Sequence, residues 1–139
     1  MGRQDTYLEH LSQVPMFSVC SKKELTLIMR RSQERTVAAG TKLTEEGKPG
    51  DELFIIFEGE CRITRNGKRV TDLGPGDFFG ELALLDKPVR DATITATSPM
   101  TVLVVRRREF EVLLIEVPSI ARKLLRALAQ RLHSLDALP

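Results

Sequence analysis

Turn-forming residues divide the middle of the chain at short, regular intervals, and this spacing limits the possible fold more than any other feature. Between residues 40 and 76, a turn recurs about every six to ten residues, with short strand-like runs between the turns. Evenly spaced strands of this kind indicate a β-sandwich or a jelly-roll barrel. The turns lie at residues 40, 47–51, 58–59, 66–67 and 74–76, and the predicted strands at 42–44, 52–57, 61–64 and 69–73.

The pair Asn66-Gly67 supports this interpretation, because both residue types tolerate the positive φ that a two-residue hairpin turn requires. Two further strands are predicted at residues 93–97 and 101–105, where β-branched residues alternate with others. We therefore expect a mainly β fold over residues 35–106, a double-stranded β-helix or jelly-roll barrel.

Helical patterns flank this β-roll on its N-terminal side. The apolar positions 7, 8 and 11 predict a short helix that ends before Pro15. The sequence SKKE at residues 21–24 is a capping box, in which the side chains of Ser21 and Glu24 bind each other's backbone amides. It predicts a second helix that runs to about Arg31.

Two more helices are predicted after the β-roll, the first stopped by Pro118. The second carries an apolar stripe that packs either against the chain's own core or against a second copy, and both readings remain open. Residues 1–139 are thus expected to form one domain, with N-terminal helices in 1–34 and C-terminal helices in 107–139. The apolar residues are Phe110, Leu113, Leu114 and Val117 in the first helix and Ile120, Leu124, Leu128, Leu132 and Leu135 in the second.

Composition excludes several classes of function. The formal net charge of +2 is too balanced to indicate a nucleic-acid or membrane partner, and the basic run at residues 106–108 is expected to be a solvated strand end. Because the sequence contains neither a long apolar run nor a signal-peptide pattern, we expect a cytoplasmic location.

Cys20 and Cys61 are expected to be reduced core residues, and no spacing of cysteines or histidines predicts a metal site. Motifs of catalytic nucleophiles are absent from the sequence, so no enzymatic activity is expected.

The segment 79–96, FGELALLDKPVRDATITA, carries the chemistry. Gly80 lets a ligand approach its backbone amide, and the helical turn over residues 82–85 favours an anion near its amides. Arg90 supplies charged donors that match phosphate oxygens, and Glu81 can accept from a sugar hydroxyl. Phosphate and ribose together indicate a nucleotide with one negative charge, because no triphosphate-binding GxxxxGK[ST] motif is present. The alternative is that Glu81 and Arg90 form an ion pair that only ties the segment to the barrel.

This segment resembles the phosphate-binding cassette of the cyclic nucleotide-binding domain family, whose pattern runs roughly F-G-E-L-A-L, a short loop, then P-R-x-A-T. The family includes protein kinase regulatory subunits, cyclic nucleotide-gated channels and bacterial catabolite activator-type regulators. The resemblance extends over nearly the whole chain. It includes the motifs VPMF at residues 14–17, AGT at 39–41, GKPGD at 47–51, FEG at 57–59 and LGPG at 73–76.

The resemblance implies a role for each matching residue. Glu81 and the Gly80 amide would bind the ribose 2′-hydroxyl, and Arg90 the exocyclic phosphate oxygens. The base would lie against two side chains of the β-roll, and a residue of the last helix would close over it. In this assignment Ala83, Asp91 and Ala92 contribute backbone amides. Ile63 and Thr71 contact the base, and Arg131 closes over it. The predicted ligand-binding residues are Gly80, Glu81, Leu82, Ala83, Arg90, Asp91, Ala92, Ile63, Thr71 and Arg131.

Two departures from the family pattern affect this prediction. Val89 stands between Pro88 and Arg90, where the family has proline directly before arginine. Asp91 occupies a position where relatives carry alanine, serine or threonine, and its charge near the phosphate leaves the choice between cAMP and cGMP open.

We therefore expect a non-catalytic cyclic nucleotide sensor that binds cAMP, with cGMP second, and needs no cofactor or metal. Ligand capture would move the C-terminal helices, and an effector protein or domain, which the sequence does not identify, would receive the signal. The alternative is a ligand-independent interaction domain that keeps the fold and dimerises through the last helix.

Overall fold

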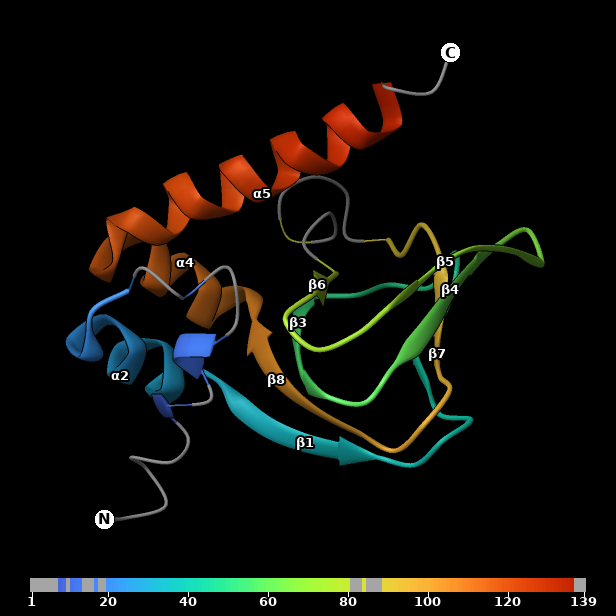
Figure 1. The fold of residues 1–139 in the computed structure, drawn as a ribbon, viewed down its shortest axis with the longest axis horizontal. Helices are drawn as coiled ribbons and strands as arrows, with labels where there is room; N and C mark the ends of the chain where they lie inside the picture. The colour runs from blue at the N-terminus through green and yellow to red at the C-terminus, as the bar shows by residue number, and fades with distance from the viewer. Residues whose placement is uncertain are drawn as a thin grey trace.

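The described residues form two four-stranded antiparallel sheets that enclose a roll (Figure 1). The computed structural model describes residues 8–9, 11–13, 17, 20–80, 84 and 89–136, with residues 127 and 131–136 as backbone only. One sheet has the order β1-β8-β3-β6, and the other has the order β2-β7-β4-β5. The strands are β1 (Gln33–Val37), β2 (Lys42–Thr44), β3 (Glu52–Glu58), β4 (Cys61–Arg65), β5 (Lys68–Leu73), β6 (Phe78–Phe79), β7 (Thr93–Ala96) and β8 (Met100–Arg106).

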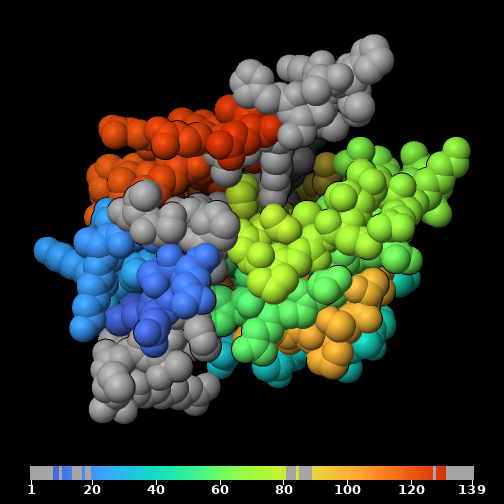
Figure 2. Space-filling model, in the orientation of Figure 1, coloured from blue at the N-terminus to red at the C-terminus, as the bar shows by residue number. Residues whose placement is uncertain are grey.

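The pairing of the strands confirms the predicted jelly-roll. Strand β1 pairs with β8, β2 with β7, β3 with β6, and β4 with β5, all antiparallel. The chain is thus a long hairpin wound into a roll, and its innermost turn is at Asn66 and Gly67. Their φ angles of 55° and 76° confirm the predicted two-residue turn. The β4–β5 hairpin projects from the body of the molecule (Figure 2).

Alternation along two central strands separates two hydrophobic clusters. In β3, Phe54 and Ile56 face the interior of the roll, whereas Leu53 and Ile55 belong to a cluster shared with the helices. Strand β8 alternates in the same way, because successive side chains of a strand point to opposite faces. Both strands are therefore buried on two sides, which explains their nearly continuous apolar sequences.

The helices cover the outer face of the β1-β8-β3-β6 sheet. They are α2 (Lys22–Arg30), α4 (Arg107–Glu116) and α5 (Pro118–Asp136), and α5 runs along one edge of the molecule (Figure 1). The capping box of α2 is present as predicted: Ser21 Oγ accepts from Glu24 N at 3.1 Å, and Ser21 N donates to Glu24 Oε1 at 2.8 Å. Leu8 and Leu11 are helical and buried in the cluster that the helices share with the sheet, which agrees with the first predicted helix.

The apolar stripe of α5 contacts the chain's own core in its first half. Ile120 and Leu124 are buried in the helix-facing cluster, and Leu128 packs against it. The side chains of Leu132 and Leu135 lie outside the described residues. Neither the described part of α5 nor any other described helix is long and apolar enough to cross a bilayer.

Two strands, β1 and β6, were not predicted from the sequence. One prediction needs correction: the basic run at residues 106–108 is not simply a solvated strand end. Arg106 ends β8 and is 65% exposed, but Arg107 opens α4 and its Nη1 donates to the carbonyl oxygen of Leu84 at 3.0 Å. This arginine therefore has a structural role, joining the cassette to the first C-terminal helix.

Both cysteines are free thiols, as predicted. Cys61 is fully buried inside the roll, and this burial raises the pKa of its thiol to about 11. Cys20 is only half-buried, and its Sγ accepts a hydrogen bond from Lys123 Nζ at 3.0 Å. Cys20 thus lies at the contact of the α2 N-terminus with α5 rather than inside the core.

Candidate functional site

The main chain of Arg90 is fixed against the turn that precedes β3. Gly47 N donates to the Arg90 carbonyl oxygen, and Arg90 N donates to the Lys48 carbonyl oxygen, both at 2.8 Å. Next to this pair, Pro49 and Val89 form an isolated antiparallel bridge. The extra residue that the sequence places between Pro88 and Arg90 therefore takes part in a short sheet-like contact.

The Arg90 side chain is buried, with only 7% of the residue exposed. Its Nη1 donates to the carbonyl oxygen of Gly80 at 3.2 Å, and its Nη2 donates to that of Glu52 at 2.9 Å. The guanidinium carbon lies 5.7 Å from the centre of the Phe54 ring, within the range of a cation–π contact. Two residues of β3 and the glycine directly after β6 thus hold one cation inside the protein.

Two glycines make this position possible. A Cβ atom built on Gly50 would lie 2.0 Å from Arg90 Nε, so any side chain there would displace the guanidinium. A Cβ on Gly80 would lie 2.5 Å from the Glu52 carbonyl oxygen and 2.9 Å from Arg90 Nη1. Gly80 also has a φ of 91°, which favours glycine. Gly80 is therefore required by the protein's own packing, and the predicted approach of a ligand to its amide stays a prediction.

The rest of the predicted cassette is described only in part. Glu81, Leu82 and Ala83 lie outside the described residues, so the choice between a ribose contact and an ion pair with Arg90 stays open. Leu84 is described as helical and is 9% exposed, within the same hydrophobic cluster as Phe110 of α4. The cassette is thus connected to the C-terminal helices through the core.

The two residues after Arg90 have different environments. Ala92 is buried, and its carbonyl oxygen accepts from Thr44 Oγ1 at 2.9 Å. Asp91 is exposed and forms an ion pair with Arg65 of β4, with 3.4 Å between Arg65 Nη2 and Asp91 Oδ2. The charge of Asp91 is therefore balanced by a residue that the sequence did not identify.

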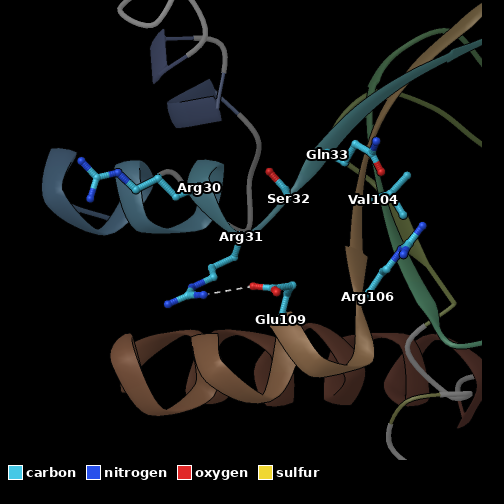
Figure 3. Close-up of a pocket in the computed structure, with 7 residues that line it drawn as sticks. All are labelled: Arg30, Arg31, Ser32, Gln33, Val104, Arg106 and Glu109. Atoms are coloured by element: carbon cyan, nitrogen blue, oxygen red, sulfur yellow. Dashed lines mark hydrogen bonds and ion pairs between the residues drawn. The ribbon is translucent and has the colours of Figure 1, made fainter.

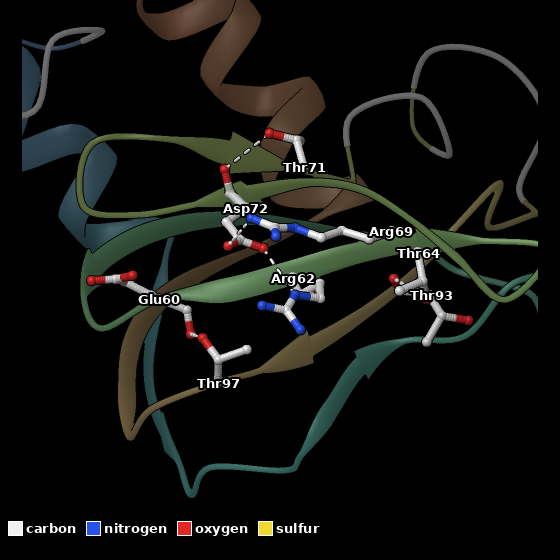
Figure 4. Close-up of polar contacts among 8 residues, drawn as sticks. All are labelled: Glu60, Arg62, Thr64, Arg69, Thr71, Asp72, Thr93 and Thr97. Carbon is white, nitrogen blue, oxygen red and sulfur yellow. Dashed lines mark hydrogen bonds and ion pairs between the residues drawn. The ribbon is translucent and has the colours of Figure 1, made fainter.

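The predicted base contacts lie opposite each other on neighbouring strands. Ile63 of β4 pairs with Thr71 of β5, and Ile63 is half-buried against the interior cluster of the roll. Thr71 is exposed, and its Oγ1 donates to the Asp72 carbonyl oxygen at 3.4 Å (Figure 4). Arg131 belongs to α5, but its side chain lies outside the described residues. No contact in the structure tests a role of these residues in binding.

Sequence reasoning missed Gly50, Glu52, Phe54 and Arg65. The first three act through long-range packing around Arg90, which local patterns do not reveal. Arg65 had a weak signal, because it directly precedes the predicted Asn66-Gly67 turn. That position places its side chain at the end of a hairpin, where it can reach a neighbouring segment.

A separate polar groove of about 440 Å³ lies where α2, β1, β8 and α4 meet (Figure 3). Arg31 lines it and donates to Glu109 and Glu116 of α4 at 3.2 and 3.1 Å. None of the predicted site residues lines this groove. These ion pairs connect α2 to α4, so we regard the groove as part of the helix–sheet junction. Among the described residues, no three metal-ligating side chains gather at one place.

Comparison with known proteins gives matches to one family. The family model of the cyclic nucleotide-binding domain matches residues 34–116. The cyclic nucleotide-gated potassium channel mll3241 of Mesorhizobium japonicum is 34% identical over 111 residues, which cover 80% of this chain and 31% of the channel. The chain therefore spans about a third of the length of this curated relative.

Solved structures agree with this match over the whole fold. The catabolite activator protein of Thermus thermophilus superposes with a TM-score of 0.82 at 30% identity, covering 88% of this chain and 60% of that one. The structure of PKAR CBD2 with bound Sp-2Cl-cAMPS has a TM-score of 0.79 at 27% identity, covering 96% and 92%. The second match extends over nearly all of both chains, so the similarity is that of an entire domain.

Proposed function

Because this chain belongs to the cyclic nucleotide-binding domain family, we propose that it binds cAMP, with cGMP as the second candidate ligand, through Arg90. The chain is a cyclic nucleotide-sensing regulatory module, as its relatives are regulatory subunits, activators and gated channels. Which nucleotide it prefers, and what it regulates, are the parts of the function that we infer.

The burial of Arg90 is the observation that carries this proposal. A guanidinium offers several N–H donors in a fixed plane, and a cyclic phosphodiester presents two oxygens that share one negative charge. Their attraction is stronger away from water, where the effective dielectric constant is lower. The Gly80 and Glu52 carbonyl oxygens hold the guanidinium at a fixed place before a ligand arrives. Such preorganisation reduces the entropy that binding costs.

The other predicted contacts complete the proposed site. We assign Glu81 and the Gly80 amide to the ribose 2′-hydroxyl, and the backbone amides of Ala83, Asp91 and Ala92 to the phosphate. Leu82 is a further predicted ligand-binding residue of the cassette. The base would lie against Ile63 and Thr71, with Arg131 of α5 closing over it. No cofactor or metal is needed for this binding.

The core supplies a route from the site to the C-terminal helices. Leu84 of the cassette shares a hydrophobic cluster with Phe110 and Leu113 of α4 and with Ile120 and Leu124 of α5. A tightened cassette would shift Leu84, and the helices would repack against it. The output would be a population shift, limited by the difference in the ligand's affinity for the two arrangements. The effector that reads this shift is a further protein or domain.

Calorimetric titration with cAMP and with cGMP tests the proposal. We expect one-site saturable binding for the wild type. Arg90→Ala should weaken binding by on the order of 2–5 kcal/mol, at least about thirtyfold. Arg90→Lys should lie between them, because it keeps the charge and loses the planar fork. Thermal unfolding of each variant shows whether it is folded, and equal weak heats for wild type and Arg90→Ala would refute the proposal.

A ligand-independent dimerisation domain is the second candidate. The exposed Leu125 on α5, 66% accessible, and Ile115 on α4, 79% accessible, favour it. That function predicts a native molecular mass that rises with protein concentration in the absence of nucleotide, and no heat of binding on titration with cAMP or cGMP.

We further propose that the chain is not an enzyme, so cyclic nucleotide should be recovered unchanged after long incubation with the protein.

A further inference from the structure

We propose that Arg65 is a positioning residue for nucleotide binding, because it neutralises and holds Asp91 beside the phosphate-binding Arg90. This inference rests on the proposed function and explains how the chain accommodates an aspartate next to an anion site. Arg65 would act through Asp91 and would not touch the ligand itself.

The guanidinium of Arg65 donates hydrogen bonds to two atoms of Asp91. Arg65 Nε donates to the Asp91 carbonyl oxygen at 3.0 Å, and Nη2 donates to the carboxylate oxygen Oδ2 at 3.4 Å. The first bond fixes the main chain directly after Arg90, and the second turns the carboxylate toward β4. Together they determine both the position of Asp91 and the direction of its charge.

The hairpin that carries Arg65 is itself anchored next to Arg90. Asn66 N donates to Glu46 Oε1 at 2.9 Å, and Glu46 N donates to Thr93 Oγ1 at 3.0 Å. The neighbouring residue Gly47 holds the Arg90 carbonyl oxygen. The tip of the β4–β5 hairpin, the turn after β2 and the start of β7 therefore form one connected polar structure around residues 90 and 91. Arg65 is thus placed by several contacts rather than by its ion pair alone.

The electrostatic consequence follows from the position of Asp91. The Arg90 guanidinium would receive a singly charged phosphate, and the next residue along the chain bears a negative charge. Without a counter-charge, the carboxylate would repel the incoming phosphate. The side chains of Arg65 and Asp91 are 50% and 57% exposed, so solvent screens this repulsion and its effect on affinity is moderate. We therefore expect an effect of several-fold on the dissociation constant.

A mutant cycle measured by calorimetry with cAMP tests this role. In 50 mM salt, Arg65→Gln should raise the dissociation constant about three- to tenfold, and the loss should shrink in 500 mM salt. Combining Arg65→Gln with Asp91→Asn should restore most of the affinity, because no carboxylate then needs a counter-charge. Rescue and salt dependence are readouts that a merely structural role of Arg65 would not give.

The chain offers a matched control on the same strand. Arg62 of β4 pairs with Asp72 of β5, with 3.1 Å between Arg62 Nε and Asp72 Oδ1 (Figure 4). Arg62→Gln removes an arginine of the same charge from the same strand, while Asp72 keeps its ion pair with Arg69 at 2.7 Å. We expect this variant to leave the dissociation constant unchanged. A loss in Arg62→Gln as large as that in Arg65→Gln would overturn the proposal, because net charge alone would then explain both.

The remaining outcomes separate this inference from the proposed function. If the wild type binds cAMP and Arg65→Gln binds it equally well, the inference fails and the function stands. An equal loss for Arg65→Gln in the wild-type and Asp91→Asn backgrounds also overturns it, since neutralisation would not be involved. If the wild type binds neither cAMP nor cGMP, both proposals fail together.

Discussion

Gly50 shows how a residue without a side chain can control a binding site. Its missing Cβ leaves the space that the Arg90 side chain occupies, and the added atom in Gly50→Ala would lie 2.0 Å from Arg90 Nε. We expect Gly50→Ala to displace the guanidinium and to weaken cAMP binding at least about tenfold, with a loss of about 1–3 kcal/mol in the free energy of unfolding from overpacking. Calorimetry and urea unfolding measure the two effects.

Gly74 supplies the control for this prediction. A Cβ there would meet only Glu60 Cγ, at 3.9 Å, which is an ordinary contact. Gly74→Ala should therefore leave nucleotide affinity unchanged and alter stability by less than about 0.5 kcal/mol. Wild-type affinity in Gly50→Ala would show that the position of Arg90 does not matter for binding.

The residues at the site were predictable only where a motif contains them. Arg90 and Gly80 were identified from the sequence, because they belong to one contiguous cassette. Gly50 lies in the GKPGD motif, but that motif did not reveal its contact with Arg90. Glu52 was not identified either, since both residues reach Arg90 through contacts between distant segments. Glu52 contributes a main-chain carbonyl oxygen, and no side-chain pattern can indicate such a contact.

At the scale of elements, Glu24 connects the start of α2 to the start of α5. Its carboxylate accepts from Ser119 Oγ at 2.6 Å and from Ser21 N at 2.8 Å, and these two hydrogen bonds lower the pKa of Glu24 from its ordinary value of 4.5. A lowered pKa means that the stability from Glu24 is present above about pH 4.5 and is lost as the pH falls through the folded-state pKa. Glu24→Gln should cost about 1 kcal/mol at pH 7, and this difference should narrow toward pH 3.

Urea unfolding at several pH values checks this prediction, with Glu111→Gln as the control. Glu111 is an exposed residue of α4, so its substitution should change stability by less than about 0.5 kcal/mol at every pH. A difference between wild type and Glu24→Gln that stays constant down to pH 3 would contradict the assigned ionisation.

Elements with a strong local pattern were predicted nearly to the residue. The capping box located α2, turn residues bounded four of the eight described strands, and β-branched alternation located two more. Strand β1 was missed because its polar sequence QERTV shows no alternation, and its place is determined by pairing with β8. Strand β6 has two residues, which pair with β3 and stack the Phe79 ring 4.8 Å from that of Phe54. Both strands depend on tertiary contacts that a local pattern does not contain.

For the whole molecule, the jelly-roll pairing explains why the site exists at all. Strand β3 pairs with β6 and with β8, and β7 follows the cassette directly, so residues 50–54, 80 and 90 meet at one place. The helices pack on the opposite face of β3, where Leu53 and Ile55 belong to their cluster. Strand β3 is thus in contact with Arg90 on one face and with the hydrophobic cluster of the helices on the other.

This arrangement predicts that ligand binding changes the dynamics of α4 and α5. In saturating cAMP, hydrogen exchange should slow more in α4 and the described part of α5 than in α2. Helix α2 contributes Leu25 and Ile28 to the same cluster as Leu84, but only α4 and α5 are proposed to repack. Leu84→Ala should bind cAMP but lose most of this response, since the truncated side chain leaves a gap in the shared cluster. Ile115→Ala removes an exposed apolar side chain of α4, 79% accessible, and should keep the response. Hydrogen exchange measured by mass spectrometry tests this prediction. Equal slowing of exchange in α4, α5 and α2 would mean that the ligand stabilises the fold generally, without a relay through Leu84.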